Sequence, residues 1–166
     1  GHGRISGNDF GPLISKTQKE RVMSYIDLGR EEGAELLTGG NSYGDQGHFV
    51  QPTIFSNVDG GMRIAKEEIF GPVLCAQSFS SQDLEKIASE ANDTPYGLSG
   101  SVWSQDISIA HKMAMLIDAG QVSINCHAAV DPAIPFGGNK QSGWGREFGA
   151  EGLEAYLKTK ATTVIF

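Results

Sequence analysis

An alternation of strand and helix patterns in the middle of the chain constrains its fold more than any other feature. Short runs rich in apolar and β-forming residues occur at 73–79, 98–103 and 122–126, as is typical of strands. The segments 81–92 and 107–118 between them repeat apolar residues at helical spacing. This order predicts an α/β fold with a mostly parallel βαβαβ sheet, because right-handed crossover helices join parallel strands.

The region before this alternation predicts one long helix and a short strand. Residues 15–33 have the periodicity of a helix, and Ser15 can cap its first turn. The residues expected on its apolar face are Val22, Tyr25 and Ile26. A strand is expected at 49–55, where Pro52 indicates an edge or a bulge because proline has no backbone N–H to donate.

The last part of the chain predicts a loop, a short helix and a terminal strand. Residues 135–149 are rich in glycine, and a helix is expected near 151–157. Residues 162–166 are uncharged and rich in β-forming side chains. An unpaired strand of this kind tends to associate with another strand, so we expect it to join a sheet elsewhere.

Composition and charge exclude several classes of function. The chain has 13 basic and 20 acidic residues and a net charge of -7, which argues against a nucleic-acid-binding surface. No apolar stretch is long enough to cross a membrane. The four histidines and two cysteines show no metal-ligand spacing, so no metal is expected. Two cysteines do not indicate a disulfide scaffold, and we expect a reducing, cytoplasmic location.

Two local motifs suggest chemistry but are weak. The glycines of 143–149 resemble a phosphate-binding loop, but their spacing differs from the dinucleotide fingerprint and no strand leads into them. Cys126 and His127 suggest a thiol hydrolase. Adjacent strand residues point to opposite faces, so these two side chains would not meet. A buried, inert Cys126 at a strand end is the favoured interpretation.

The adjacent carboxylates Glu67 and Glu68 leave two interpretations open. They can be an ordinary surface pair. Alternatively, a glutamate near an aromatic residue, in a loop before a strand, can serve a nucleotide, since a carboxylate accepts hydrogen bonds from ribose hydroxyls and a ring packs against a flat base. The physical chemistry of the sequence does not choose between them.

Several motifs in order resemble the C-terminal part of the NAD(P)-dependent aldehyde dehydrogenase superfamily. The similarity begins at 11–15 (GPLIS) and continues essentially to the end of the chain. Its strongest pieces are 67–73 (EEIFGPV), 91–98 (ANDTPYGL), 101–104 (SVWS), 119–125 (AGQVSIN) and 135–143 (PFGGNKQSG), followed by 145–147 (GRE). Several motifs at matching separations are far more specific than any one of them.

The resemblance implies a domain organisation. Residues 1–10 would be a disordered, linker or tag-derived lead-in, and 11–150 would form the C-terminal portion of the catalytic domain. Residues 151–166 would supply a helix and an oligomerisation strand that reaches a neighbouring subunit. A homo-oligomer is therefore expected.

The resemblance also implies site residues. Glu68 matches the glutamate that holds a cofactor ribose, and Phe70 matches the aromatic residue beside the nicotinamide. Phe136 matches an aromatic residue of the substrate tunnel, although plain core packing is the alternative for this ring. Ile134 and the loop that contains Val130 would lie near Phe136. A supporting catalytic role, in ordering the machinery or relaying protons, falls to Glu147.

The family mechanism uses a cysteine nucleophile and a glutamate base, and neither matches a residue of this chain. The resemblance thus implies part of an enzyme that oxidises aldehydes with NAD, or with NADP, and a chain that alone binds no cofactor and is inactive. Within the superfamily, 124–127 (INCH) with 130–131 (VD) and 134–136 (IPF) resembles phenylacetaldehyde dehydrogenases, and it also fits retinal- or betaine-aldehyde types. The resemblance thus implies an aromatic or medium-chain aldehyde. The alternative is a natural truncated protein that acts as a non-catalytic oligomerisation partner of full-length subunits.

Overall fold

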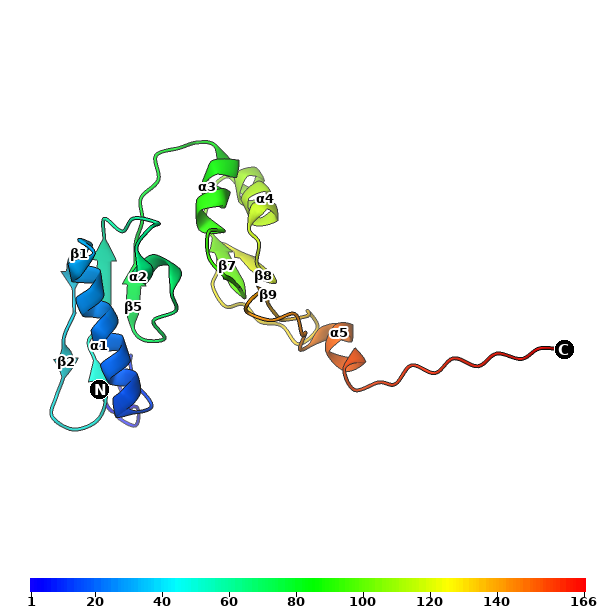
Figure 1. Cartoon of the computed structure of the whole chain (residues 1–166), viewed down its shortest axis with the longest axis horizontal. Coiled ribbons are helices and arrows are strands. Elements are labelled where there is room, and N and C mark those ends of the chain that lie inside the picture. The colour runs from blue at the N-terminus through cyan, green and yellow to red at the C-terminus, as the bar shows by residue number, and fades with distance from the viewer. The chain divides into compact units, whose positions relative to one another are not determined.

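The computed structural model describes all 166 residues, which form two compact units of mixed α/β structure (Figure 1). The first unit comprises Gly1–Ser80 and the second comprises Ser81–Phe166. No helix is long and apolar enough to cross a bilayer. Each unit contains its own helices and strands.

The first unit packs one long helix on a small sheet. Its elements are α1 (Lys16–Glu31), β1 (Glu35–Thr38), β2 (Ser42–Tyr43), β3 (Phe49–Val50), β4 (Thr53–Ser56), α2 (Arg63–Lys66) and β5 (Val73–Cys75). The sheet order is β1-β4-β5, with β1 antiparallel and β5 parallel to β4, and β2 pairs with β3 in a separate hairpin. The expected cap of α1 is confirmed, since the Ser15 hydroxyl accepts a hydrogen bond from the Gln18 N–H at 3.1 Å.

The core of the first unit lies between α1 and the sheet. The side chains of Val22 and Ile26 from α1 and Phe55 from β4 are fully buried. Gly29 lets the helix approach closely, because a Cβ there would lie 3.0 Å from the Phe55 ring and 3.1 Å from Ile64. Burial of these apolar side chains is the main contribution holding α1 against the sheet.

The second unit contains a parallel strand–helix–strand unit. Its elements are α3 (Leu84–Ala91), β6 (Tyr96–Gly97), β7 (Ser99–Val102), α4 (Ile107–Leu116), β8 (Gln121–Ile124), β9 (Asn139–Lys140) and α5 (Gly149–Glu154). Strands β7 and β8 pair in parallel with α4 between them, and β6 pairs antiparallel with β9. Asp83 and Asp106 cap α3 and α4, each accepting two backbone N–H groups. Ala88, Ala110 and Met113 are the buried apolar residues of this unit.

The structure corrects the predicted arrangement of strands. Parallel pairing is observed in β4–β5 of the first unit and in β7–β8 of the second, and the continuous βαβαβ sheet stays a prediction. The strand predicted at 49–55 is divided into β3 and β4, which belong to different sheets. Pro52 lies at the division, where the missing N–H interrupts a ladder.

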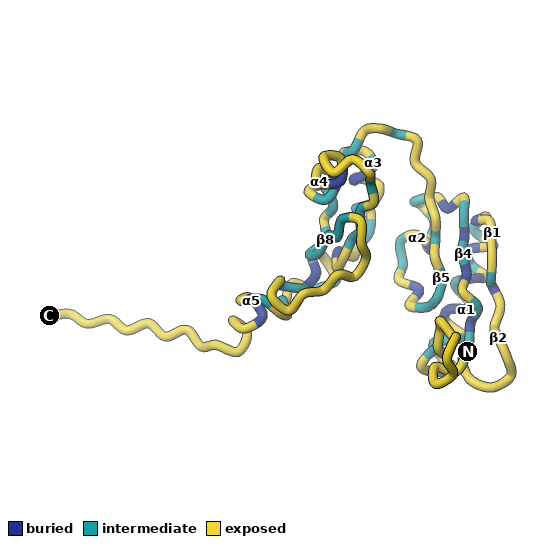
Figure 2. The backbone as a smooth tube through the Cα atoms, turned by 180° about the vertical axis from the view of Figure 1, so that it is seen from behind, coloured by how far each residue is buried: buried dark blue, intermediate teal, exposed yellow.

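The C-terminal region also differs from its prediction. The short helix is Gly149–Glu154 rather than 151–157. Residues 158–166 contain no strand, and the tail is exposed along its length (Figure 2). A strand needs a partner for its backbone groups, so the oligomerisation strand remains a prediction about an assembly.

Replacing Phe55 by Ala should destabilise the first unit by about 3–5 kcal/mol, because a fully buried ring would leave a cavity against α1. Urea unfolding followed by circular dichroism measures this loss. Leu74→Ala is the matched control in the adjacent strand, since Leu74 is 59% exposed and should cost far less. Equal losses in the two variants would contradict this placement of the core.

Candidate functional site

The adjacent glutamates that follow α2 have different surroundings. The Arg63 guanidinium donates to both oxygens of the Glu67 carboxylate, from Nε to Oε1 at 2.7 Å and from Nη2 to Oε2 at 3.0 Å. The Tyr25 hydroxyl from α1 donates to Oε2 at 2.6 Å. The side chain of Glu68 is exposed. Glu67 therefore makes side-chain contacts within the first unit while staying partly exposed, whereas Glu68 is exposed.

These contacts keep Glu67 ionised. The hydrogen bonds from Arg63 and then from Tyr25 lower the pKa of Glu67 to about 2. The hydrogen bond from Tyr25 to Glu67 raises the pKa of Tyr25. The hydrogen bonds from Arg63 to the Glu67 carboxylate raise the pKa of Arg63. Glu67 is thus held in an ion pair at the surface, whereas the Glu68 carboxylate is exposed, and both interpretations of this pair stay predictions.

Phe70 is presented beside Glu68 by an unusual backbone turn. Its φ is 57°, in the left-handed region that non-glycine residues seldom adopt, and its ring is 69% exposed. Ile69 between them is buried in the core of the first unit. The buried Ile69 therefore anchors the segment, while Glu68 and Phe70 project outward from it. Both residues predicted to bind the cofactor are thus exposed on the same short segment.

In the second unit, a pair of backbone hydrogen bonds joins Phe136 to Glu147. The Phe136 N–H donates to the Glu147 carbonyl and the Glu147 N–H donates to the Phe136 carbonyl, each at 2.8 Å. The Arg146 guanidinium donates to the Gly138 carbonyl at 2.7 Å and so closes the loop between them. Gly137 has a structural role, because a Cβ there would collide with the Gly145 carbonyl. The candidate tunnel and supporting catalytic residues are thus adjacent.

The remaining substrate candidates lie in the loop before Phe136. Val130 is 46% exposed and Ile134 is 56% exposed, whereas Phe136 is half-buried. The Asp131 carbonyl accepts the Ile134 N–H at 2.9 Å, which forms a turn. These apolar side chains are available for an apolar ligand, as tunnel residues must be.

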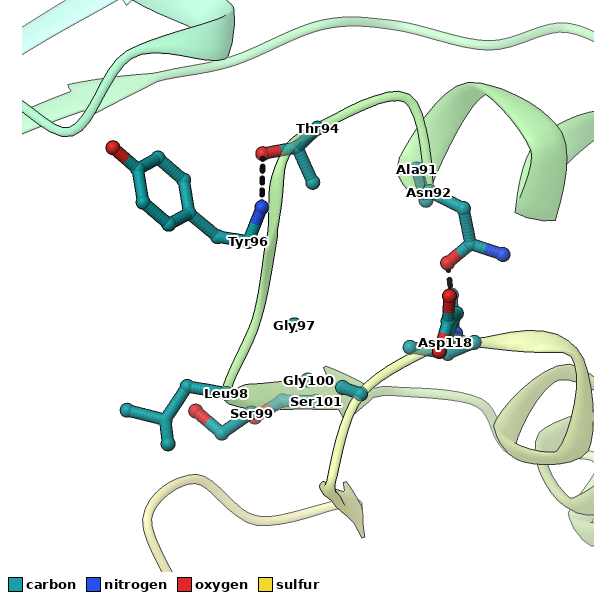
Figure 3. A pocket seen from close by; sticks show the side chains of 12 residues that line it. Ala91, Asn92, Thr94, Tyr96, Gly97, Leu98, Ser99, Gly100, Ser101 and Asp118 are labelled. Carbon is teal, nitrogen blue, oxygen red and sulfur yellow. Dashed lines mark hydrogen bonds between the residues drawn. The ribbon is translucent and has the colours of Figure 1, made fainter. Parts of the chain in front are cut away.

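An open cavity in the second unit was not anticipated from the sequence. Its volume is 360 Å³, and it is lined by residues from 91–101 and 117–119 (Figure 3). The Asn92 side chain accepts the Asp118 N–H and donates to the Leu116 carbonyl, each at 2.8 Å. The signal that could have identified Asn92 is its place at the C-cap of α3, where an amide can satisfy backbone groups. No predicted site residue lines this cavity.

Cys126 and His127 do not lie in a strand. Strand β8 ends at Ile124, and Asn125 adopts a left-handed φ of 54°. Cys126 is exposed, so the predicted buried cysteine is wrong. A ring nitrogen of His127, Nδ1, lies 2.8 Å from the Ser101 hydroxyl and forms a hydrogen bond with it. No group of three or more His, Cys, Asp or Glu side chains is arranged to hold a metal ion.

Comparison with protein families decides the relationship. The model described as the aldehyde dehydrogenase family matches residues 1–162. The chain belongs to the aldehyde dehydrogenase family. It is 48% identical to aldehyde dehydrogenase 1 of Tanacetum cinerariifolium over 92% of this chain and 30% of that protein. The chain spans about a third of the length of the curated relatives it matches.

Solved aldehyde dehydrogenase structures share the fold of this chain. The NAD+ complex of the enzyme from Bacillus cereus superposes with a TM-score of 0.86 at 44% identity, over 93% of this chain and 31% of that one. Indole-3-acetaldehyde dehydrogenase from P. syringae, in complex with NAD+ and IAA, gives 0.89 at 42% identity, over 93% and 31%. The family resemblance seen in the motifs is therefore confirmed.

In this aldehyde dehydrogenase chain, Arg63→Met should raise the pKa of Glu67 from about 2 towards its ordinary value of 4.5, because the largest stabilising hydrogen bonds are lost. A lowered pKa means that ionised Glu67 stabilises the fold above about pH 4.5, and that this stability is lost as the pH falls towards 2. Carboxyl ¹³C NMR titration measures the shift. Lys16→Met, on the exposed start of α1, is the control, and an unchanged Glu67 titration in Arg63→Met would contradict the assignment.

The two thiols of this aldehyde dehydrogenase chain should react at different rates. Cys126 is exposed, whereas Cys75 is half-buried and burial raises its pKa, which reduces the thiolate fraction. Brief treatment with iodoacetamide should therefore label Cys126 first, as mass spectrometry of the peptides would show. Cys126→Ser should abolish the fast phase and Cys75→Ser should not. Faster labelling of Cys75 would contradict the exposure seen in the structure.

Proposed function

We propose that this chain is the C-terminal part of an NAD(P)-dependent enzyme that oxidises aldehydes to carboxylic acids. Its part in that enzyme is to supply cofactor-ribose and substrate-tunnel residues. The observation that carries the proposal is the exposure of Glu68 and Phe70 on one anchored turn, while the neighbouring Glu67 is held by Arg63 and Tyr25. Family membership supports the reaction class, and a relative of similar fold is an NAD+ complex.

The cofactor residues fit the chemistry of a nicotinamide nucleotide. An exposed carboxylate at Glu68 accepts hydrogen bonds from the two hydroxyls of a ribose. The exposed ring of Phe70 offers a flat apolar surface for the nicotinamide end. When bound, the cofactor supplies the hydride acceptor, and these residues hold and orient it. NAD is proposed as the natural cofactor, with NADP as the alternative.

The second unit supplies the substrate side. Phe136, Ile134 and Val130 present apolar surface for the aldehyde, and Glu147 is fixed beside Phe136 by the paired backbone hydrogen bonds. Glu147 would order the catalytic groups or relay a proton. An aromatic aldehyde is the proposed substrate, in a phenylacetaldehyde dehydrogenase-like enzyme. The similarity to a dehydrogenase of indole-3-acetaldehyde supports that choice.

The whole protein would contain the nucleophilic cysteine and the base glutamate outside these 166 residues. Residues 1–10 would lead into the catalytic portion at 11–150, and residues 151–166 would form a strand on joining a neighbouring copy. We therefore propose a cytoplasmic homo-oligomer, and a chain that is inactive by itself. The exposed Val164, Ile165 and Phe166 supply apolar surface for that assembly.

The size and activity of the natural protein test the proposal. An antibody against this chain should detect one band far larger than the chain, and the captured protein should reduce NAD with phenylacetaldehyde. A band at the mass of the chain, without activity but with full-length dehydrogenase attached, would favour the non-catalytic oligomerisation partner. Aldehyde oxidation by the purified chain alone would overturn the claim that the nucleophile lies elsewhere.

In the complete protein, Glu68→Gln should raise the KM for NAD by about tenfold or more, because charged hydrogen bonds contribute roughly 1.5–3 kcal/mol. The KM for the aldehyde should change little. Steady-state kinetics measures both, and Glu90→Gln on the exposed face of α3 is the control. An unchanged KM for NAD in Glu68→Gln would remove the main support for the cofactor site.

A further inference from the structure

We propose that Gln18 and Arg21 of α1 are positioning residues that hold the turn at 68–70 in the conformation that binds the cofactor. This inference rests on the proposed function, because it concerns the same cofactor residues. Neither residue was identified from the sequence. The two act on the backbone of the turn, and so determine where Glu68 and Phe70 point.

One face of α1 contacts successive residues of the turn. The Gln18 amide nitrogen donates to the Phe70 carbonyl at 2.9 Å and to the Ile69 carbonyl at 3.4 Å. The Arg21 Nη2 donates to the Glu68 carbonyl at 2.7 Å. Residues three apart on a helix lie on one face, which explains why both can reach the same short segment. We call Gln18 and Arg21 the α1 clamp.

Gln18 makes these contacts instead of a local one. It stands three residues after the N-cap Ser15, where a glutamine side chain commonly turns back to the N–H of the cap residue and closes a capping box. Here the Ser15 hydroxyl accepts the Gln18 N–H, which is half of that motif. The side chain of Gln18 is directed to Ile69 and Phe70, 51 and 52 residues away. Its amide is therefore available to stabilise the turn.

The turn needs such support because of its backbone. Phe70 has a φ of 57°, and a non-glycine residue in this region carries a conformational cost that the surroundings must offset. The Gln18 amide donates to the carbonyl of Ile69, which precedes Phe70, and to the carbonyl of Phe70 itself. Gly71 allows the segment to approach α1 closely, since a Cβ there would lie 2.6 Å from a methyl group of Val22. The strained conformation thus depends on α1.

Arg21 is held in place on its other side. Its guanidinium carbon lies 5.3 Å from the centre of the Tyr25 ring, one helical turn further along α1. The Tyr25 hydroxyl is in turn bound to Glu67, which Arg63 holds. Arg21 therefore reaches the Glu68 carbonyl from a fixed position and leaves the Glu68 carboxylate exposed.

Gln18→Glu tests the clamp, because it keeps the shape of the side chain but replaces the N–H donor with an acceptor facing carbonyl oxygens. In the complete protein, the KM for NAD should rise about tenfold, while kcat and the KM for the aldehyde should stay within about twofold. Thr17→Ala, on the exposed side of the same turn of α1, is the control and should change none of these values.

Hydrogen exchange provides a readout that does not need activity. Gln18→Glu should accelerate amide exchange at 68–71 without changing exchange in β4, which separates release of the turn from unfolding. Arg21→Lys retains a donor and should keep much of the NAD affinity, whereas Arg21→Met should lose it. Equal behaviour of the two Arg21 variants would overturn the hydrogen-bonding role of Arg21.

The outcomes separate this inference from the proposed function. If Gln18→Glu accelerates exchange at 68–71 but leaves the KM for NAD unchanged, the positioning role is overturned. It is also overturned if Gln18→Glu changes neither the exchange nor the KM for NAD. If the unmodified complete protein binds no NAD(H), the proposed function fails and the cofactor role of the clamp fails with it. The exchange data would then still decide whether Gln18 holds the turn.

Discussion

The burial of α1 against the β1-β4-β5 sheet is the interaction on which the first unit depends. Val22, Ile26 and Phe55 exclude water from this contact, and Gly29 allows the helix to approach the Phe55 ring. Because the apolar stripe fixes the rotation of α1 about its axis, it also fixes the polar residues beside that stripe. The contacts of Gln18 and Arg21 with the turn at 68–70 are therefore a consequence of core packing.

The second unit uses backbone pairing for the same purpose. The two hydrogen bonds between Phe136 and Glu147 place these residues side by side without any contribution from their side chains. The connecting loop must turn tightly, and only glycine fits at 137, where a Cβ would collide with the Gly145 carbonyl. Arg146 adds charged donors to the loop carbonyls. The side chains of Phe136 and Glu147 thus remain available for function.

Membership of the aldehyde dehydrogenase family gives these two arrangements a common interpretation. The proposed cofactor residues lie in the first unit, and the proposed substrate and supporting catalytic residues lie in the second. The chain spans about a third of its curated relatives. Under the proposed function, the chain supplies positioned cofactor and substrate residues. The carboxylates of Glu67 and Glu68 differ in the same way, because Glu67 stabilises the structure and Glu68 stays free to bind.

The sequence by itself determined the three longer helices, the parallel β7–β8 pair and the family, because periodicity, caps and ordered motifs are local signals. The candidate site residues came from family resemblance, since side-chain chemistry alone left Glu67 and Glu68 equivalent. Only the tertiary structure distinguished these two glutamates and showed that Cys126 is exposed. The tertiary structure also divided the predicted strand at Pro52 and directed the Gln18 side chain to a turn some 50 residues away. These outcomes depend on solvent exposure and on contacts between distant segments, which no local pattern encodes.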